Sequence, residues 1–374
     1  MLTRADEWPI HQTAEPIAYA GTDRNFYDRY FFCGYLADGT GYFAVAFGVY
    51  PHLNVADAHV SIVGADGVQR CLHASRLLGM ERMELSVGPI RIEVIEPLMK
   101  LRLVVEETDG IALDLVCTGR SAPVQEPRFT RRMGPRTLMD VTRFTQTVRW
   151  NGTVRVDGAT TSYADATSFG TRDRSWGVRP IGASDPQPTV PPELPQFYWL
   201  WAPTNFPNLS LYFHVNEDAA GQAWNTRCEL MMDGAAQGAG IALKDPKATP
   251  VWKPGTRHAA SVRLEARDAH GRQHTVTWTP IATFAMKGIG YGHPEWGHGG
   301  WKGELAVARE DFRLADLDPL VPGHLHIQAL ARAVHTGPDG LGSEGIGIVE
   351  QLVIGPHAPS GLRSILDGAP ETGA

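Results

Sequence analysis

Residues able to do chemistry are concentrated in three segments, the first of which is "SFGTRDRSWGVRP" (residues 168–180). It places Asp173 between Arg172 and Arg174 and continues with Trp176. Two neighbouring guanidinium groups favour the ionised carboxylate, which makes Asp173 a natural ion-pair anchor. The segment can therefore be a structural corner held by ion pairs, or the wall of an active site. The residues alone leave both interpretations open.

The second segment, "FYWLWAPTNFPNLSLYFH" (residues 197–214), is rich in large aromatic rings. Strand alternation places Trp199 and Trp201 on one face and Tyr198 on the other, and His214 follows in the next apolar run. Buried aromatic residues usually belong to a core. Large rings on one face also suit the wall of a broad apolar pocket, so both readings stay open here too.

The third segment, "GYGHPEWGHGGWKGE" (residues 290–304), combines His293, Trp296 and His298 with glutamates and several glycines. Glycine lets a loop approach a ligand closely. Histidine and glutamate can donate or accept protons in a pocket. The same residue types also occur in solvated surface loops, so the pattern is compatible with a site or with a plain loop.

We expect neither a metal nor a nucleotide cofactor. His324 and His326 form a His-x-His pair on a predicted strand over 324–331, and such imidazoles could hold zinc or iron. No carboxylate follows this pair at the spacing of cupin-like sites. The segment "GLGSEG" (340–345) fits a GxGxxG pattern, but a strand-like run follows it where a dinucleotide site requires a helix.

Composition and charge exclude several classes of protein. The chain has 374 residues, of which 43% are hydrophobic and 20% charged, as in globular domains. The net charge of −7 and the lack of a basic run argue against nucleic-acid binding. No segment resembles a signal peptide or is long enough to span a bilayer, and the four scattered cysteines suggest reduced thiols. These features predict a cytoplasmic protein without a membrane span.

The elements that position these residues are predicted to be short antiparallel strands. Apolar residues alternate with polar ones over 209–215 and 274–279, and the 40 glycines and 27 prolines disfavour long helices. The proline-rich segment 180–196 reads as a connection between two halves. We therefore predict an all-β protein with two β-barrel-like domains, residues 1–185 and 186–374, and few helices. A cleft between two domains is a common place for a small-molecule site.

Four motifs together resemble the AttH/hydroxyneurosporene-synthase (carotenoid 1,2-hydratase)-like superfamily over residues 140–360. They are, in order, "TRDRSWGVR", the "WLW" strand, "YGHPEWGHGGWKGE" and "GIVEQLVIGPHAPSG". The resemblance implies two lipocalin-like β-barrels packed side by side, with activities that include carotenoid 1,2-hydratases, kievitone hydratase-like enzymes and cyclases for Diels–Alder reactions. In the hydratases an aspartate precedes His-Asn and then a glycine. Asp173 and Gly177 match, but Arg174 and Ser175 replace His-Asn, so the implied fold and apolar substrate class carry over better than hydration itself.

The predicted function is acid–base hydration, isomerisation or cyclisation of a hydrophobic unsaturated small molecule of terpenoid, polyene or aromatic type. The enzyme would be a lyase (hydratase) or an isomerase/cyclase, with an aromatic-lined pocket near the domain interface. The candidate catalytic residues are Asp173, His214, His293, His298 and His326. The candidate substrate-binding residues are Arg172, Trp176, Tyr198, Trp199 and Trp296. The alternative is a carrier for a lipid-like ligand, which needs apolar walls but no pair of titratable groups; a homodimer is left open.

Overall fold

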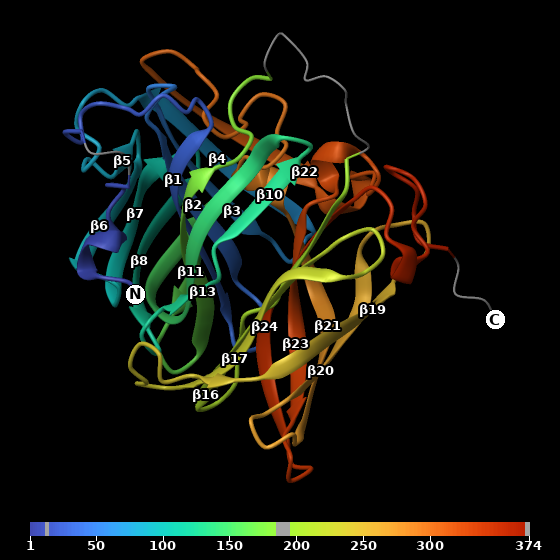
Figure 1. Ribbon diagram of the computed structural model, residues 1–374. Coiled ribbons are helices and arrows are strands. Elements are labelled where there is room, and N and C mark those ends of the chain that lie inside the picture. The colour runs from blue at the N-terminus through green and yellow to red at the C-terminus, as the bar shows by residue number, and fades with distance from the viewer. Residues whose placement is uncertain (12–14, 185–194, 371–374) are drawn as a thin grey trace. The chain divides into compact units, whose positions relative to one another are not determined.

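The protein is built from antiparallel strands. Its structure, a computed structural model, describes residues 1–11, 15–184 and 195–370. Within these ranges the only helices are 3-10 turns of three or four residues (Figure 1). None of them is long and apolar enough to cross a membrane. The predicted all-β class with few helices is confirmed.

The chain divides into two compact units, which are described separately. The first comprises Met1–Pro188 and Gly288–Phe312, and the second Thr189–Lys287 and Arg313–Ala374. Residues 288–312, which sequence reasoning assigned to the C-terminal half, thus belong to the first unit. The predicted division after residue 185 otherwise stays a prediction, because residues 185–194 of the proline-rich connection lie outside the described residues.

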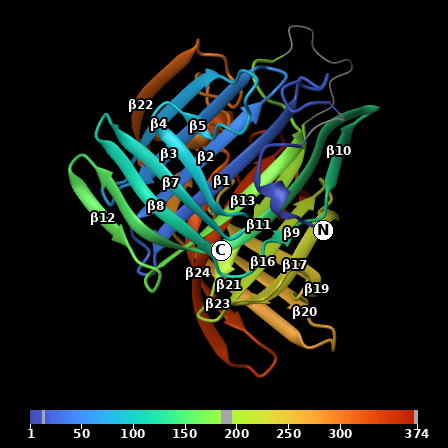
Figure 2. The same cartoon turned by 90° about the vertical axis from the view of Figure 1, so that its left-hand side faces the viewer.

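The first unit contains one large antiparallel sheet. Its elements are η1 Arg4–Glu7, β1 Phe26–Leu36, β2 Tyr42–Tyr50, β3 Val55–Val63, β4 Val68–Leu77, β5 Ser86–Val87, β6 Ile90–Glu96, β7 Lys100–Thr108, β8 Ile111–Gly119, β9 Val124–Gln125, β10 Phe129–Met133, β11 Arg136–Val156, β12 Ala159–Tyr163, β13 Ser168–Val178 and β22 Leu305–Arg313. The strand order is β22-β4-β3-β2-β1-β13-β11-β8-β7-β6-β5, and Figure 2 shows β22 beside β4. The inward side chains of β1 to β4 and of β6, β7, β8 and β11 meet in one core, as in a nearly closed lipocalin-like barrel.

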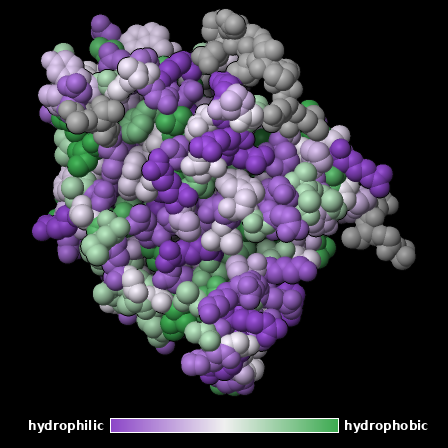
Figure 3. All heavy atoms as spheres, in the orientation of Figure 1, coloured by the Kyte–Doolittle hydropathy of each residue, from purple (hydrophilic) through white to green (hydrophobic). Residues whose placement is uncertain are grey.

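The second unit is a ten-stranded antiparallel sheet with its own core. Its elements are β14 Phe197–Trp201, β15 Thr204–Asn205, β16 Leu209–Glu217, β17 Ala223–Met232, β18 Ile241–Ala242, β19 Lys244–Trp252, β20 Ala259–Arg267, β21 Gln273–Ala285, η2 Met286–Ile289, η3 Leu314–Asp316, η4 Pro322–His324, β23 Ile327–Thr336, β24 Gly342–Ile354 and η5 Ala358–Ser360. The strand order is β18-β17-β16-β14-β24-β23-β21-β20-β19. Hydrophilic side chains cover the exposed face of β19 and β20 (Figure 3), in agreement with the alternating burial of these strands. The polar face of β19 protects this edge of the sheet.

The segment around Asp173 forms strand β13, and its ion pairs differ from those expected. Arg172 and Arg174 point into the barrel, where they pair with Glu7 at 2.8 Å and with Asp28 at 2.5 Å. Consecutive residues of a strand point to opposite faces, so Asp173 cannot anchor its two sequence neighbours. The interpretation of Asp173 as their common anchor was wrong, and the segment is a regular strand paired with β1 and β11.

The expected His-x-His strand also differs from the structure. Pro322 begins the 3-10 turn η4, which ends at His324, and β23 begins only at Ile327. His324 and His326 therefore do not share a strand face. The cause is Pro322, whose fixed φ angle favours the first position of a helical turn.

Candidate functional site

The candidate site lies on the outward face of β3 and β4 in the first unit. Along β3, Asp57, His59 and Ser61 alternate with residues of the barrel core. The antiparallel register places His59 opposite His73 of β4. Both imidazoles are almost fully buried, with 1% and 0% of their surface exposed. A buried row of polar residues on the outer face of a barrel requires a cover that supplies polar partners.

Residues 288–304 provide part of that cover. A Cβ atom at Gly288 would lie 2.7 Å from the hydroxyl of Ser61, and one at Gly290 would lie 2.9 Å from Nε2 of His59. Gly290 also has a φ of +92°, which other residues rarely adopt. Glycine at these positions lets the backbone lie directly on the histidine row.

This segment fixes the tautomer of His293, a predicted catalytic residue. Its Nδ1 accepts hydrogen bonds from the backbone amides of Glu295 at 3.0 Å and Trp296 at 2.8 Å. The proton of the neutral ring must therefore be on Nε2, which lies 2.8 Å from Oε2 of Glu310. His293 thus donates to the carboxylate of Glu310, a residue of β22.

His73 lies against the same carboxylate. Its Nε2 is 3.6 Å from Oε2 of Glu310, and its ring is 5.2 Å from that of His293. The ring of Trp296 stacks on His73 with a centroid distance of 5.5 Å. The Glu310 side chain is 33% exposed, whereas both histidines are buried. Glu310 is consequently the titratable member of this group that is partly exposed.

A second histidine connects this carboxylate to an aspartate. Nδ1 of His59 lies 2.9 Å from Nδ1 of His73, and Nε2 of His59 lies 3.6 Å from Oδ1 of Asp57. One proton lies between the two Nδ1 atoms, so the neutral pair has one remaining N–H, directed either at Asp57 or at Glu310. Both outer Nε2 atoms of the His59–His73 pair carry a hydrogen only when the pair has taken up one extra proton. The two separations of 3.6 Å are longer than hydrogen bonds, and Nε2 of each histidine is buried without a hydrogen-bond partner among the described residues. The four groups therefore line up as a path along which a proton can move between Asp57 and Glu310 only when both separations shorten.

Burial determines the resting state of this path. It lowers the pKa of His73 to about 4, so His73 is neutral at pH 7. Asp57 is fixed at the other end by the hydroxyl of Tyr50 at 3.1 Å and the amide of Gly299 at 2.7 Å. The path can take up a proton only transiently, as acid–base catalysis requires.

The same group was tested as a metal site. Ligand atoms of His73, His293 and Glu310 lie within 4.8 Å of one another. A metal would need the lone pair of Nε2 on His293. That nitrogen carries the proton, because two backbone amides occupy the lone pair of Nδ1. The donor chemistry fits a proton-transfer site better than a metal centre, and the expected absence of a metal stays a prediction.

His298, another predicted catalytic residue, has both ring nitrogens in hydrogen bonds. Arg179 donates to Nδ1 at 3.0 Å, so Nε2–H donates to the carbonyl of Ile289 at 2.8 Å. Burial first, and then Arg29 and Arg179, hold the pKa of His298 well below its usual value. We assign His298 a positioning role, since it keeps residues 289–299 on the histidine row.

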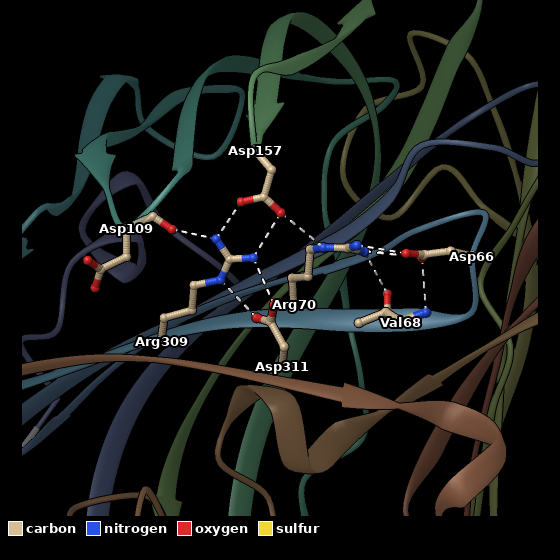
Figure 4. Close-up of polar contacts among 7 residues, drawn as sticks. All are labelled: Asp66, Val68, Arg70, Asp109, Asp157, Arg309 and Asp311. Atoms are coloured by element: carbon tan, nitrogen blue, oxygen red, sulfur yellow. Dashed lines mark hydrogen bonds and ion pairs between the residues drawn. The ribbon is translucent and has the colours of Figure 1, made fainter.

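Strand β22 is fixed to the first unit by an ion-pair network next to Glu310 (Figure 4). Arg309 binds the carboxylate of Asp157 through two hydrogen bonds of 2.6 and 2.9 Å. Arg70 contacts the same carboxylate at 3.3 Å and also pairs with Asp66 at 2.7 Å. The network joins β22 to β4 and to the turn after β11, and so fixes the backbone that carries Glu310.

The second unit has a separate polar cluster around Glu350. Its carboxylate accepts hydrogen bonds from Trp199 at 3.0 Å and Gln328 at 2.8 Å, and lies 2.9 Å from Nε2 of His326. Burial opposes ionisation of Glu350, but His326 and the two hydrogen-bond donors hold its pKa below the usual value. The ring of His214 lies 5.7 Å from that of Trp199. The structure thus brings two predicted residues, Trp199 and His326, to a carboxylate that sequence reasoning missed, and places His214 next to Trp199.

The other predicted residues lie apart from these clusters. Arg172 is buried in the barrel core, and Tyr198 in the core of the second unit, where it stacks on His357. Trp176 stacks on His11. Asp173 is half-buried on the face of β13 opposite to Arg172 and contributes to the charge environment of Arg29. Their predicted roles remain untested.

Sequence reasoning missed His59, His73 and Glu310. The segments "DAHVS" and "CLHAS" each place one histidine at a polar position of a period-two pattern. A strand with this alternation is expected to expose its polar face to solvent, so the sequence did not indicate that the two histidines are buried. Glu310 gave no signal, because "AREDFR" reads as an exposed charged strand.

Comparisons with known proteins support the fold. The sequence profile of a family described as "Family of unknown function (DUF8625)" matches residues 2–363. No curated protein matches the chain. A candidate AttH from Nitrosomonas europaea shares 13% identity with a TM-score of 0.50, covering 91% of this chain and 98% of that one. The structure of CghA with Sch210972 shares 11% identity with a TM-score of 0.50, covering 92% and 97%. Kievitone hydratase from Nectria haematococca shares 12% identity with a TM-score of 0.46, covering 87% and 88%. The predicted resemblance to the AttH-like lipocalin-fold superfamily is confirmed at the level of the fold.

Proposed function

The chain belongs to the DUF8625 family, and we propose that this member is an enzyme that transfers protons to and from an apolar, unsaturated small molecule. The observation that carries the proposal is Glu310, a partly exposed carboxylate between Nε2 of His293 and Nε2 of His73. Behind His73, the path through His59 ends at Asp57. An acid–base enzyme needs two or more titratable groups close to one another, whereas a carrier does not need them.

The reaction begins when the carboxyl form of Glu310 protonates a carbon of the double bond, leaving a carbocation on its neighbour. Loss of a proton from the adjacent carbon to the Glu310 carboxylate gives isomerisation. Attack by water followed by proton loss gives hydration, and attack by a second double bond followed by proton loss gives cyclisation. In each case the released proton returns to the carboxylate of Glu310, directly or through His73, and so regenerates the carboxyl form for the next turnover.

The solved structure of CghA with Sch210972 supports a small-molecule ligand for a fold of this kind. The alternative carrier function needs only apolar walls, and the buried histidine row then has no role. The terpenoid, polyene or aromatic substrate type, the cytoplasmic location and the homodimer stay predictions from the sequence.

The test is proton exchange with solvent. The purified full chain is incubated in D2O with a panel of terpenoid, polyene and alkenyl-aromatic compounds, and products and deuterium incorporation are read by mass spectrometry. Glu310→Gln should lower exchange and turnover by roughly a hundredfold or more. Glu304→Gln is the matched control and should retain wild-type rates, because Glu304 is an exposed glutamate that directly precedes β22.

Two outcomes would contradict the proposal. Full activity of Glu310→Gln would show that the carboxylate takes no part in proton transfer. Tight binding of an apolar compound by wild type and Glu310→Gln alike, without exchange or turnover, would favour the carrier.

A further inference from the structure

A buried guanidinium in the first unit has no counter-ion within the part of the chain that the structure describes. Arg82 is 2% exposed, and its Nη2 donates to the carbonyl of Tyr19 at 3.3 Å. Its Nη1 is buried without a hydrogen-bond partner among the described residues. The buried Arg172 and Arg174, by contrast, each pair with a buried carboxylate. A buried cation without a partner is costly, so we looked for a ligand that could supply the missing charge.

Arg82 lines a cleft of about 480 Å³. That volume lies within the usual range for small-molecule sites, roughly 300–1,000 Å³. One wall is aromatic: Trp176 stacks on His11 with a centroid distance of 3.7 Å and an angle of 8°, and Phe26 also lines the cleft. The cleft therefore offers a flat apolar surface next to a buried positive charge.

The acidic residues of this region do not neutralise the guanidinium. Asp140 is bound by Arg128 through hydrogen bonds of 2.8 and 2.5 Å, and Asp23 is exposed to solvent. Asp28 lies 2.5 Å from Nη1 of Arg174. Burial lowers the pKa of Arg82, and the negative charge of Asp28 opposes that shift. With both histidines neutral, the lining carries two positive and two negative charges, and Arg82 is the cation that has no carboxylate within ion-pair distance among the described residues.

We propose that this cleft binds a planar aromatic carboxylate, whose anionic group pairs with the guanidinium of Arg82 and whose ring packs beside Trp176. A single unpaired guanidinium matches the single charge of a carboxylate, and the carboxylates of Asp23 and Asp140 disfavour a dianionic phosphate. No residue that lines this cleft belongs to the histidine row, so the proposal does not depend on the proposed function.

Calorimetric titration of the full chain tests the proposal with 2-naphthoate as the probe. Wild type should bind it with a Kd below 1 mM, and Arg82→Met should bind at least about tenfold more weakly, because a buried charged hydrogen bond is lost. Arg155→Met is the matched control, since Arg155 lies outside the cleft and pairs with Glu107 on the surface; its Kd should stay within about threefold of wild type. The neutral 2-naphthamide should bind wild type at least about tenfold more weakly than 2-naphthoate.

Thermal melting shows whether a loss of binding reflects unfolding. Removing an unpaired buried charge should leave Arg82→Met at least as stable as wild type. Equal affinity of wild type and Arg82→Met for 2-naphthoate would overturn the proposal, as would equal affinity of wild type for the acid and the amide. Tighter binding of 2-naphthyl phosphate than of 2-naphthoate would overturn the assignment to carboxylates.

Discussion

Replacing Glu7 by glutamine should lower the free energy of unfolding of the first unit by about 3–5 kcal/mol. Glu7 accepts hydrogen bonds from Nη1 and Nη2 of Arg172 at 2.8 and 3.0 Å, and from the amide of Leu98 at 2.6 Å. Both charged side chains are essentially fully buried, with 0% and 1% exposed. Glutamine keeps the shape of Glu7 but leaves the guanidinium of Arg172 without a counter-ion in the barrel core. The expected cost is that of an uncompensated buried charge.

The assay is thermal and urea-induced unfolding followed by circular dichroism. Units of 150–250 residues lose roughly 2–4 °C in Tm per kcal/mol, so Glu7→Gln should melt roughly 6–20 °C below wild type. The control is Glu107→Gln, which breaks a 2.7 Å pair with Arg155 in which both side chains are about half exposed. Its effect should stay below about 1 kcal/mol.

The double variant Glu7→Leu/Arg172→Met separates the cost of an unpaired charge from that of altered packing. It should recover much of the lost stability, because apolar pairs often replace buried ion pairs without loss. The reasoning is refuted if Glu7→Gln melts within about 1 °C of Glu107→Gln.

Three further predictions concern other charged groups. The free energy of unfolding of the first unit should fall by about 3 kcal/mol between pH 6.5 and pH 4, because His73 is protonated in the unfolded chain over this range while the folded ring stays neutral. Urea titrations of wild type and His73→Phe at pH 7 and pH 5 measure this loss. The variant should lose less stability between the two pH values than wild type does. Glu350→Gln should lower the Tm of the second unit, because the buried His326 loses its ionised partner, whereas the exposed Glu344→Gln should not. Asp157→Asn should cost less than about 1 kcal/mol, since its pairs with Arg309 are part-exposed, and the difference from wild type should shrink in 1 M NaCl.

The sequence alone was enough to predict the class of fold. Period-two apolar runs over 209–215 and 274–279 lie in β16 and β21, and the "FYWLW" run forms β14. Local side-chain alternation encodes these strands, so no knowledge of their partners was needed. The loop 290–304 was also singled out correctly as a dense polar segment, and it carries His293.

The pairing of those polar residues was decided by the tertiary structure. Arg172 pairs with Glu7, which lies 165 residues away in the sequence. His73 lies near Glu310 because β22 pairs with β4 in the sheet. The two arginines beside Asp173 face away from it, since strand geometry separates sequence neighbours and joins distant residues. The alternation of apolar and polar side chains within each strand can be seen in the sequence of that strand alone. The order and register of strands depend on which distant faces bury the most apolar surface together, and that is a property of the folded chain.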